Sequence, residues 1–477
     1  MVILSLQHNP STMKELRFFL IASAVVLFSC QSLAQPTWDA GEGTTLYELD
    51  LVTGVNLPWE ILWGPDDHIW ATLRSGQVIR INPETGSYTE ILDIEVTDDG
   101  DGEPGLLGMA MHPDWDNTPQ VYLVYNEGPW WNASETLAVY DWNGSELVNP
   151  DVLLEMDAGG IHNGSRLLVT TDDKLLMTTG DIGSSSNSQN LNNNMGKVLR
   201  LNLDGSIPDD NPTPGSYIYS FGHRNAQGIC YGPNGTIFSS EHGQNQDDEL
   251  NIIEPDRNYG WPTVQGMCNT SNENTFCDEN NVKEPIYTWS PCVAVNGIEY
   301  YDHPGIPEWQ NSLLLAVLGG LGGQYERLSV MHLNAEGTAV DEEEEFFSSF
   351  NQRIRDICIN PNTGSVYVAF NGPSYPGSGP NTIKEFTPVQ PTGIAESSTK
   401  AFMNIFPNPA SNNSRVEFSD SLIGSLMTIF DQQGKEVGNW TIQTNSMAIG
   451  TLNLSAGQYY VRAVAHGQTF SKSLIIK

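Results

Sequence analysis

The chain has 477 residues and a formal net charge of −37, with 58 acidic residues against 21 Lys and Arg. Such a chain is repelled by phosphate backbones and anionic lipid, which excludes nucleic acid as a partner. It also holds 45 Gly, 28 Pro and 17 Tyr, while long apolar runs with a helical period are hard to find. This composition predicts an all-β protein whose many short strands are joined by turns.

The N-terminus has the order of a secretory signal peptide. The basic stretch Met13–Arg17 precedes the apolar run Phe18–Phe28 and a cleavage site after Ala34. The apolar run is too short to cross a bilayer, so we expect no transmembrane span. We therefore predict a signal peptide over residues 1–34, with Met13 as an alternative start, and export through the periplasm to the cell surface or the medium.

Export places the later cysteines in an oxidising compartment, where disulfides persist. Cys268 and Cys277 are the most local pair and the first candidates for a bridge. The others are Cys230, Cys292 and Cys358. Because this set is odd in number, at least one thiol must stay unpaired, and spacing alone does not fix the connectivity.

A hairpin pattern recurs along the chain: an apolar alternating strand, a turn of Pro, Asp, Asn or Gly, and a second apolar strand. The copies lie at Trp59–Ala71, Met109–Tyr125, Leu167–Thr178, Ile229–Ser239, Ile298–Val317 and Ile357–Phe370. One hairpin alone cannot bury both of its faces, so the copies must stack. Residues 40–388 are therefore predicted to form a six-bladed β-propeller. A strand near Thr45–Leu49 would complete the last blade, because ring closure removes exposed sheet edges.

The repeat stops at a linker over residues 389–400, which is rich in Pro, Thr and Ser. Residues 401–477 show short strands and turns such as Asp431–Gly434, a pattern typical of a small β-sandwich. With the Pro-Asn-Pro opening at Pro407–Pro409 and the terminal basic residue Lys477, this segment resembles the C-terminal sorting domain of the type IX secretion system. The resemblance implies the secretion machinery as a partner.

Three polar segments carry the chain's most unusual residues, and in a propeller they would converge on one rim of the channel. They are Ser220–Gly228, Ser240–Glu249 and Asn258–Pro262. Singly, each is more typical of a capped polar loop, although carboxylates and carbonyls in Gly-rich loops suit calcium. Together they resemble the soluble glucose/sorbosone (aldose sugar) dehydrogenases that depend on pyrroloquinoline quinone (PQQ). The resemblance spans about residues 44–388 and continues in Leu57–Trp59, Gly105–Gly108, Gly196–Arg200, Ile207–Pro212 and Arg353–Asp356.

The resemblance implies a secreted, PQQ- and calcium-dependent oxidoreductase. It would oxidise the C1 hydroxyl of an aldose to a lactone and pass the electrons to an external acceptor. His162 aligns with the family's general base, and a neutral imidazole titrates in the range that proton abstraction needs. Arg224 would lie beside the quinone oxygens and stabilise the charge that develops on reduction.

Arg353 and Arg355 lie two apart on a predicted strand, so both side chains should point to the same face. Two guanidinium groups on one face repel each other and favour an anion, and the carboxylates of PQQ suit such a pair. The resemblance further implies cofactor contacts at Asn225, His242, Asp248 and Glu103, the last replacing a glutamine of the family. It implies catalytic calcium on the main-chain carbonyls of Gly243 and Gln244, and a second, structural calcium on Glu249 and Tyr259.

Two other functions stay open at this point. One is a non-enzymatic, calcium-binding extracellular propeller that binds carbohydrate or protein, and the other is a propeller lactone hydrolase. Glu103 is compatible with the first. The sequence between Gly319 and Arg327 also has no counterpart of the family's cofactor-binding lysine, a departure that bears on cofactor affinity. The joint presence of His162 and the three arginines favours the dehydrogenase, and cofactor-dependent dye reduction would separate it from both others.

Overall fold

The computed structural model describes two segments of the chain, each with short gaps. They are residues 35–389 without 42, 98–102, 321–324, 376 and 378–380, and residues 403–476 without 407–409, 411–413, 420–421, 433–434, 449–453 and 466–467. The predicted signal peptide and nearly all of the predicted linker lie outside the described residues. The chain divides into two compact units, Met1–Gln390 and Pro391–Lys477.

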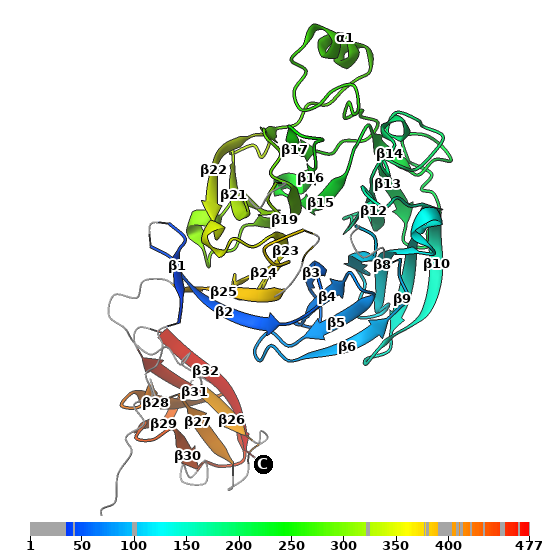
Figure 1. Ribbon diagram of the computed structural model, residues 1–477. Coiled ribbons are helices and arrows are strands. Elements are labelled where there is room, and N and C mark those ends of the chain that lie inside the picture. Colours follow the sequence, from blue (N-terminus) through cyan, green and yellow to red (C-terminus); the bar gives the residue numbers. More distant parts are fainter. Residues whose placement is uncertain are drawn as a thin grey trace, which may run out of the picture. The chain divides into compact units, whose positions relative to one another are not determined.

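Six antiparallel sheets of the first unit stand around a common centre (Figure 1). The first strand of each sheet packs against the first strands of both neighbouring sheets, from β3 through β7, β11, β15, β19 and β23 back to β3. The ring is therefore closed.

The six sheets follow one another in chain order, and the last adds the two N-terminal strands. The first sheet holds β3 (Pro58–Trp63), β4 (Ile69–Leu73), β5 (Gln77–Ile81) and β6 (Tyr88–Asp93), and the second holds β7 (Leu106–Met111), β8 (Gln120–Glu127), β9 (Ser134–Trp142) and β10 (Leu147–Asp157). The third holds β11 (Gly164–Val169), β12 (Lys174–Thr179), β13 (Lys197–Asn202) and β14 (Ile218–Phe221), and the fourth holds β15 (Ala226–Tyr231), β16 (Ile237–Glu241), β17 (Asp248–Ile252) and β18 (Tyr287–Trp289). The fifth holds β19 (Val295–Tyr301), β20 (Ser312–Val317), β21 (Arg327–Leu333) and β22 (Val340–Phe346). The sixth holds β23 (Ile354–Ile359), β24 (Val366–Phe370), β25 (Thr382–Val389), β2 (Thr45–Thr53) and β1 (Thr37–Asp39).

Each recurrent hairpin of the sequence forms the first two strands of one sheet. These strands are apolar because neighbouring sheets cover both of their faces: all five residues of β4 and all five of β24 are buried. The turns between them use residues that tolerate a left-handed backbone, such as Asp67 (φ 56°) and Asp173 (φ 57°). The all-β prediction is confirmed for this unit.

The N-terminal strand closes the last sheet, as expected. β2 pairs antiparallel with β25 along its length, and the Lys384 ammonium on β25 lies 2.7 Å from a Glu48 carboxylate oxygen on β2. Trp38 on β1 packs against Phe347 and Phe350 at centroid distances of 5.0 and 4.9 Å. The sixth sheet therefore joins the two ends of the unit.

The second unit contains two antiparallel sheets that share one apolar core. One sheet holds β26 (Met403–Phe406), β27 (Arg415–Phe418) and β30 (Ser446–Ala448). The other holds β28 (Leu426–Asp431), β29 (Glu436–Thr441), β31 (Gly457–Ala465) and β32 (Gln468–Ile476). Val416 from the first sheet and Ile429, Val461 and Leu474 from the second are all fully buried in the common core.

The hairpin pattern did not predict one helix, α1 (Ser271–Glu279), which lies in the connection between β17 and β18 (Figure 1). A capping box of Thr270 and Glu273 begins it. The expected Cys268–Cys277 disulfide is present and joins the helix to the segment that precedes it. Cys230, Cys292 and Cys358 are free thiols. In the described segments, no helix is both long and apolar enough to cross a membrane. Short 3-10 turns complete the described elements, at Trp130–Asn132, Ser185–Asn187, Pro233–Gly235, Pro307–Trp309 and Ser348–Phe350.

Candidate functional site

One end of the ring's centre opens into a cavity of about 560 Å³. Its wall is built where the first strands of the sheets begin, with Trp59 from β3, Leu107 from β7, Gly164 from β11, Gln227 from β15 and Arg355 from β23. Because each sheet presents the same end of its first strand, residues far apart in the sequence meet at one place.

Most of the residues singled out from the sequence line this cavity. They are Glu103, His162, Arg224, Asn225, His242, Gly243, Gln244, Asp248, Arg353 and Arg355. Glu249 and Tyr259 do not line it. The structure therefore brings together the expected base, the expected cofactor contacts and the expected carbonyl ligands of calcium, and places the expected structural calcium ligands elsewhere.

The cavity is rich in cations for a chain this acidic, since Arg74, Arg224, Arg353 and Arg355 all line it. Arg355 lies on β23, whereas Arg353 lies one residue before that strand rather than on it. Burial lowers the pKa of Arg355 to about 9, with repulsion from Arg353 and Arg166 acting in the same direction. Neither Arg353 nor Arg355 forms an ion pair with a carboxylate in the described part of the chain. The pair is thus half-buried positive charge that has no carboxylate ion-pair partner among the described residues.

His162 lies in the loop between β10 and β11 with a left-handed backbone, φ 58°. This conformation is strained for a residue with a side chain and needs support from its surroundings. The His162 N–H donates to a carboxylate oxygen of Glu103 at 2.7 Å, and the His162 carbonyl accepts from the N–H of Ile182 at 3.1 Å. These contacts fix the base from both sides.

The hydrogen bonds of the His162 ring also define its tautomer. Nδ1 lies 2.7 Å from Oδ1 of Asp181, and Nε2 lies 3.1 Å from the NH2 nitrogen of Arg224. A guanidinium can only donate, so Nε2 must be the acceptor and Nδ1 must carry the proton. His162 is therefore neutral in this arrangement, with its basic nitrogen beside Arg224.

Asp181, which follows β12, was not predicted from the sequence. It is 2% exposed and accepts hydrogen bonds from Trp261 Nε1 at 2.9 Å and from the Gly183 N–H at 2.8 Å. Burial alone would raise the pKa of Asp181, but its hydrogen bonds with His162, Gly183 and Trp261 outweigh it, and the pKa lies below its ordinary value. Asp181 is thus an ionised partner that can stabilise a positive charge on His162.

Arg224 is held by contacts on several sides. Its NH1 nitrogen donates to the carbonyl of His242 at 3.1 Å, and its guanidinium lies 5.4 Å from the ring centroid of Trp261. Its backbone N–H donates to Glu241. The Nε atom is buried and has no hydrogen-bond partner among the described residues.

Main-chain N–H groups hold the side chains of Asn225 and Asp248 in place, and His242 lies beside them in the cavity wall. The amide oxygen of Asn225 accepts from the Gly164 N–H at 3.1 Å. The Asp248 carboxylate accepts from the N–H groups of Gly243 at 2.8 Å and Val293 at 2.7 Å, so it fixes the loop that carries Gly243. Burial lowers the pKa of His242, and its Nε2 atom is buried without a hydrogen-bond partner in the described residues.

The residues expected to bind calcium fall into two places. In the cavity, the Gly243 and Gln244 carbonyls accept no hydrogen bond from any residue that the structure describes. Glu249 instead borders a smaller space of about 10 Å³ beside Glu241, its direct partner across β16 and β17. Burial, with the charge of Glu241 next, raises the pKa of Glu249 to about 8.

Tyr259 does not bring its hydroxyl to Glu249. The hydroxyl donates to the Ile252 carbonyl at 2.6 Å and accepts from the Glu254 N–H at 2.9 Å. Only the Tyr259 main-chain carbonyl is therefore left as a ligand. Within the described residues, no cluster of three or more His, Cys, Asp or Glu side chains has the geometry of a metal site.

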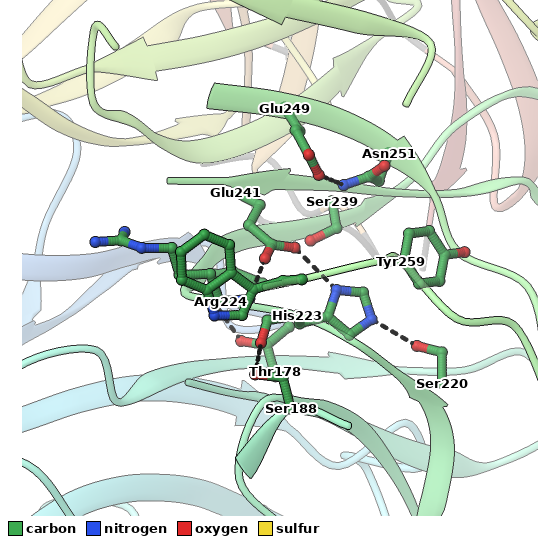
Figure 2. A network of polar contacts seen from close by, with 12 residues as sticks. Thr178, Ser188, Ser220, His223, Arg224, Ser239, Glu241, Glu249, Asn251 and Tyr259 are labelled. Atoms are coloured by element: carbon green, nitrogen blue, oxygen red, sulfur yellow. Dashed lines mark hydrogen bonds and ion pairs between the residues drawn. The ribbon is translucent and has the colours of Figure 1, made fainter. Parts of the chain in front are cut away.

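A buried polar network lies behind Arg224 (Figure 2). The His223 ring lies between Ser220 and Glu241, with Nε2 2.9 Å from the Ser220 hydroxyl and Nδ1 2.8 Å from the Glu241 carboxylate. Ser220 and His223 are 0% exposed and Glu241 is 3% exposed. This Ser-His-Glu set resembles a hydrolase triad in connectivity, but its serine is sealed from the solvent and from the cavity.

Arg166 on β11 binds main-chain carbonyls of residues that line the cavity, and it too was missed in the sequence. Its guanidinium lies 2.8 Å from Glu60 and 2.9 Å from Asp356, and it donates to the carbonyl of Gln227 at 2.6 Å and to Asn296 at 3.2 Å. These partners come from β3, β23, β15 and β19. The side chain thus connects five of the six inner strands, and it lines a second cavity of about 360 Å³.

Comparison with known proteins gives two family matches. The sequence model of the family described as glucose/sorbosone dehydrogenase matches residues 55–375. The model of the secretion system C-terminal sorting domain matches residues 404–477.

Several relatives resemble the first unit. The quinoprotein glucose dehydrogenase B of Acinetobacter calcoaceticus is 39% identical over 252 residues, 45% of this chain and 52% of that protein. The chain therefore matches about half the length of this relative. An aldose sugar dehydrogenase of Escherichia coli is 28% identical over 65% of this chain and 86% of that protein. The PQQ-bound aldose sugar dehydrogenase of Streptomyces coelicolor superposes with a TM-score of 0.62 at 29% identity, covering 75% of this chain and 100% of the other. The apo form of the E. coli enzyme gives a TM-score of 0.61 at 25% identity, with coverages of 72% and 100%.

Proposed function

Because the chain belongs to the glucose/sorbosone dehydrogenase family, we propose that it is an exported, PQQ- and calcium-dependent enzyme that oxidises the C1 hydroxyl of aldose sugars to lactones. The observation that carries the proposal is that one cavity holds both a neutral His162, with its basic nitrogen beside Arg224, and the half-buried Arg353 and Arg355, which have no ion-pair partner in the described chain. The first is a site for proton abstraction, and the second is a site for an anion.

The residues present fit PQQ. A multiply carboxylated, planar group would supply the anion that Arg353 and Arg355 lack, and two forked guanidinium groups bind carboxylates in bidentate fashion. Arg224 Nε and His242 Nε2 are buried polar atoms without partners in the described chain, and such atoms are costly unless a ligand satisfies them. Asn225 and Asp248 would border the same group, with Glu103 facing it from the His162 side.

We also propose calcium at two positions. The unpaired carbonyls of Gly243 and Gln244 are oxygen ligands of the type that calcium prefers, and they face the cofactor cavity. Glu249, with the carbonyl of Tyr259, is the proposed set for a second, structural ion. A cation there would compensate two acidic side chains that face each other across adjacent strands.

The chain's own residues would perform the proton chemistry. His162 Nε2 takes the proton of the C1 hydroxyl, and Asp181 stabilises the resulting imidazolium through Nδ1. Arg224, held by the His242 carbonyl, stabilises negative charge on the oxygens that face it. When bound, PQQ would accept the hydride from C1, and calcium would act as a Lewis acid on the quinone. An external acceptor would then take up the electrons.

Export and architecture complete the proposal. We assign each of the six sheets to one propeller blade, the two sheets of the second unit to a β-sandwich, and residues 389–400 to the linker between them. The sorting-domain match over residues 404–477 supports delivery to the cell surface or medium by the type IX machinery, after passage through the periplasm directed by a signal peptide at residues 1–34.

The alternatives have less support. A lactone hydrolase with a serine nucleophile would need that serine to be reachable, and the hydrolase-like Ser220 is fully buried. A binding propeller without cofactor would gain nothing from two half-buried arginines that lack a carboxylate partner in the described chain, because their partial desolvation costs stability.

The test is to load the metal-free protein with calcium and PQQ and to follow reduction of an artificial acceptor with a panel of aldoses. Turnover that needs both PQQ and calcium is the expected result. PQQ binding without oxidation of any aldose would refute the substrate assignment, and absence of PQQ binding would refute the enzyme.

A further inference from the structure

Lys197, the first residue of β13, is fully buried, with 0% of its side chain exposed. Removing an ammonium from water is costly unless its hydrogen bonds are replaced, and burial lowers the pKa of Lys197 to about 7. In the described part of the chain no carboxylate forms an ion pair with it. A methionine would fill such a position at a lower desolvation cost, so the ammonium must serve another purpose.

The Lys197 ammonium binds three main-chain carbonyls of a single loop. Nζ donates to the main-chain carbonyls of Asn187 at 2.9 Å, Ser188 at 3.2 Å and Met195 at 2.6 Å. All three belong to the connection between β12 and β13, residues 180–196. Lysine is the side chain that offers three donors from a single point. Here the three acceptors come from two arms of the loop, its middle at Asn187 and Ser188 and its C-terminal end at Met195. Lys197 thus draws these two arms together.

One arm leads to His162. The Asn187 side-chain amide donates to the carbonyl of Asp181 at 3.1 Å, and the Asp181 carboxylate holds Nδ1 of His162. The carbonyl of Asn187 is one of the three that Lys197 binds. A displaced arm would therefore move the carboxylate that orients the base.

The other link leads to Arg224. The Ser188 carbonyl, bound by Lys197, also accepts from the N–H of Gly222 at 3.0 Å, and the Ser188 hydroxyl donates to the carbonyl of His223 at 2.6 Å. Figure 2 shows Ser188 beneath the segment that carries His223 and Arg224. The backbone that presents Arg224 to the cavity therefore rests on the same loop.

We propose that Lys197 is a positioning residue that sets His162 and Arg224 relative to each other by clamping the 180–196 loop. It touches neither substrate nor cofactor, and it does not line the cavity. The inference rests on the proposed roles of His162 and Arg224. Its physical reason is that the two groups act on one substrate hydroxyl, and a misplacement of about 1 Å costs roughly 10²-fold in rate.

The experiment compares Lys197→Met with Lys174→Met in the calcium- and PQQ-loaded full chain. Lys174 begins the neighbouring strand β12, and among the described residues its ammonium donates only to the Asp172 carbonyl at the surface, so it controls for loss of a lysine from the same sheet. For Lys197→Met we expect kcat per PQQ-loaded protein to fall by about 10- to 100-fold, while the sugar KM and the PQQ dissociation constant stay within about threefold. Lys174→Met should match wild type. A Lys197→Met protein that folds and keeps its kcat would overturn the proposal.

Two further variants keep the proposal testable when Lys197→Met does not fold. Asn187→Ala removes the link to Asp181, and Ser188→Ala removes the hydroxyl link to His223, while both keep the carbonyls that Lys197 binds. Each should lower kcat, and wild-type kcat in both would overturn the proposal.

A spectroscopic readout separates this inference from the proposed function. The Nδ1 proton shared by His162 and Asp181 should give a downfield proton NMR resonance that Lys197→Met shifts or broadens and Lys174→Met leaves unchanged. Wild type that oxidises no aldose would refute the proposed function, whereas an unchanged resonance in Lys197→Met would refute the clamp.

Discussion

Neutralising the arginine pair is the sharpest test of the cofactor site, because it predicts opposite effects on binding and on stability. In the Arg353→Gln, Arg355→Gln protein, two charge-assisted hydrogen-bonding groups would be lost, each contributing roughly 1.5–3 kcal/mol. The dissociation constant of PQQ should therefore rise by about 10²- to 10⁴-fold. The cofactor-free protein should become more stable, since burial and mutual repulsion already hold the pKa of Arg355 at about 9. The shift in the Arg355 pKa corresponds to an unfavourable free energy of desolvation and charge repulsion of at most a few kcal/mol, which a neutral glutamine would avoid.

The assay is calorimetric titration of PQQ at constant calcium, together with thermal unfolding of the cofactor-free proteins. Arg80→Gln is the matched control, because Arg80 has a carboxylate partner, Asp66, at 2.6 Å and does not line the cavity. The control should keep its PQQ affinity and lose a little stability. Equal PQQ affinity in wild type and the double variant, or a lower melting temperature of the cofactor-free double variant, would refute the reasoning.

Further changes test the base, the buried acids and the metal. His162→Ala should lower kcat by about 10²–10⁴ with PQQ affinity retained, and near-normal turnover would remove it from the mechanism. Asp181→Asn should lower kcat too, since an amide cannot stabilise the imidazolium, and its sugar KM should change little. Burial raises the pKa of Glu135 from 4.5 to about 8, so in that pH range the folded state holds a proton that the unfolded chain has released. The free energy of unfolding should then fall as the pH rises. Glu135→Gln should make this pH dependence shallower by up to about 1.4 kcal/mol per pH unit, as measured by denaturant titrations at several pH values. The same substitution at the exposed Glu155 should leave the pH dependence unchanged. Chelating calcium should lower the melting temperature of wild type more than that of Glu249→Gln, and equal losses would argue against an ion at Glu249.

The two inner strands of each sheet were predictable, because strands that are buried on both faces consist of nearly continuous apolar residues. Outer strands carry less of that signal. β22, with the sequence Val-Asp-Glu-Glu-Glu-Glu-Phe, has mostly exposed or half-buried residues, so alternation does not reveal it. The helix α1 has no buried residue, and it therefore lacks the apolar stripe by which a helix is recognised.

The site was predictable where a loop motif carries the chemistry and unpredictable where a contact joins distant segments. His162 and Arg224 stand in segments that resemble the family. Asp181, by contrast, follows an ordinary strand, and its role appears only because the fold places its carboxylate 2.7 Å from His162. A carboxylate directly after Gly180, at the end of a predicted inner strand, was the one available signal. Arg166 looks like any other strand residue in the sequence, because the partners of its guanidinium lie 61 to 190 residues away along the chain.

Arg166, which joins the inner strands of the ring, has a consequence for how substrates reach the cofactor cavity. Arg166 bonds to four other inner strands, so on the proposed function we expect it to prevent passage along the axis and to leave one mouth for the cofactor cavity. On the proposed function, sugar, lactone and electron acceptor would share that mouth and occupy it in turn. The steady-state kinetics should then be of the ping-pong type, with each substrate inhibiting the half-reaction of the other at high concentration.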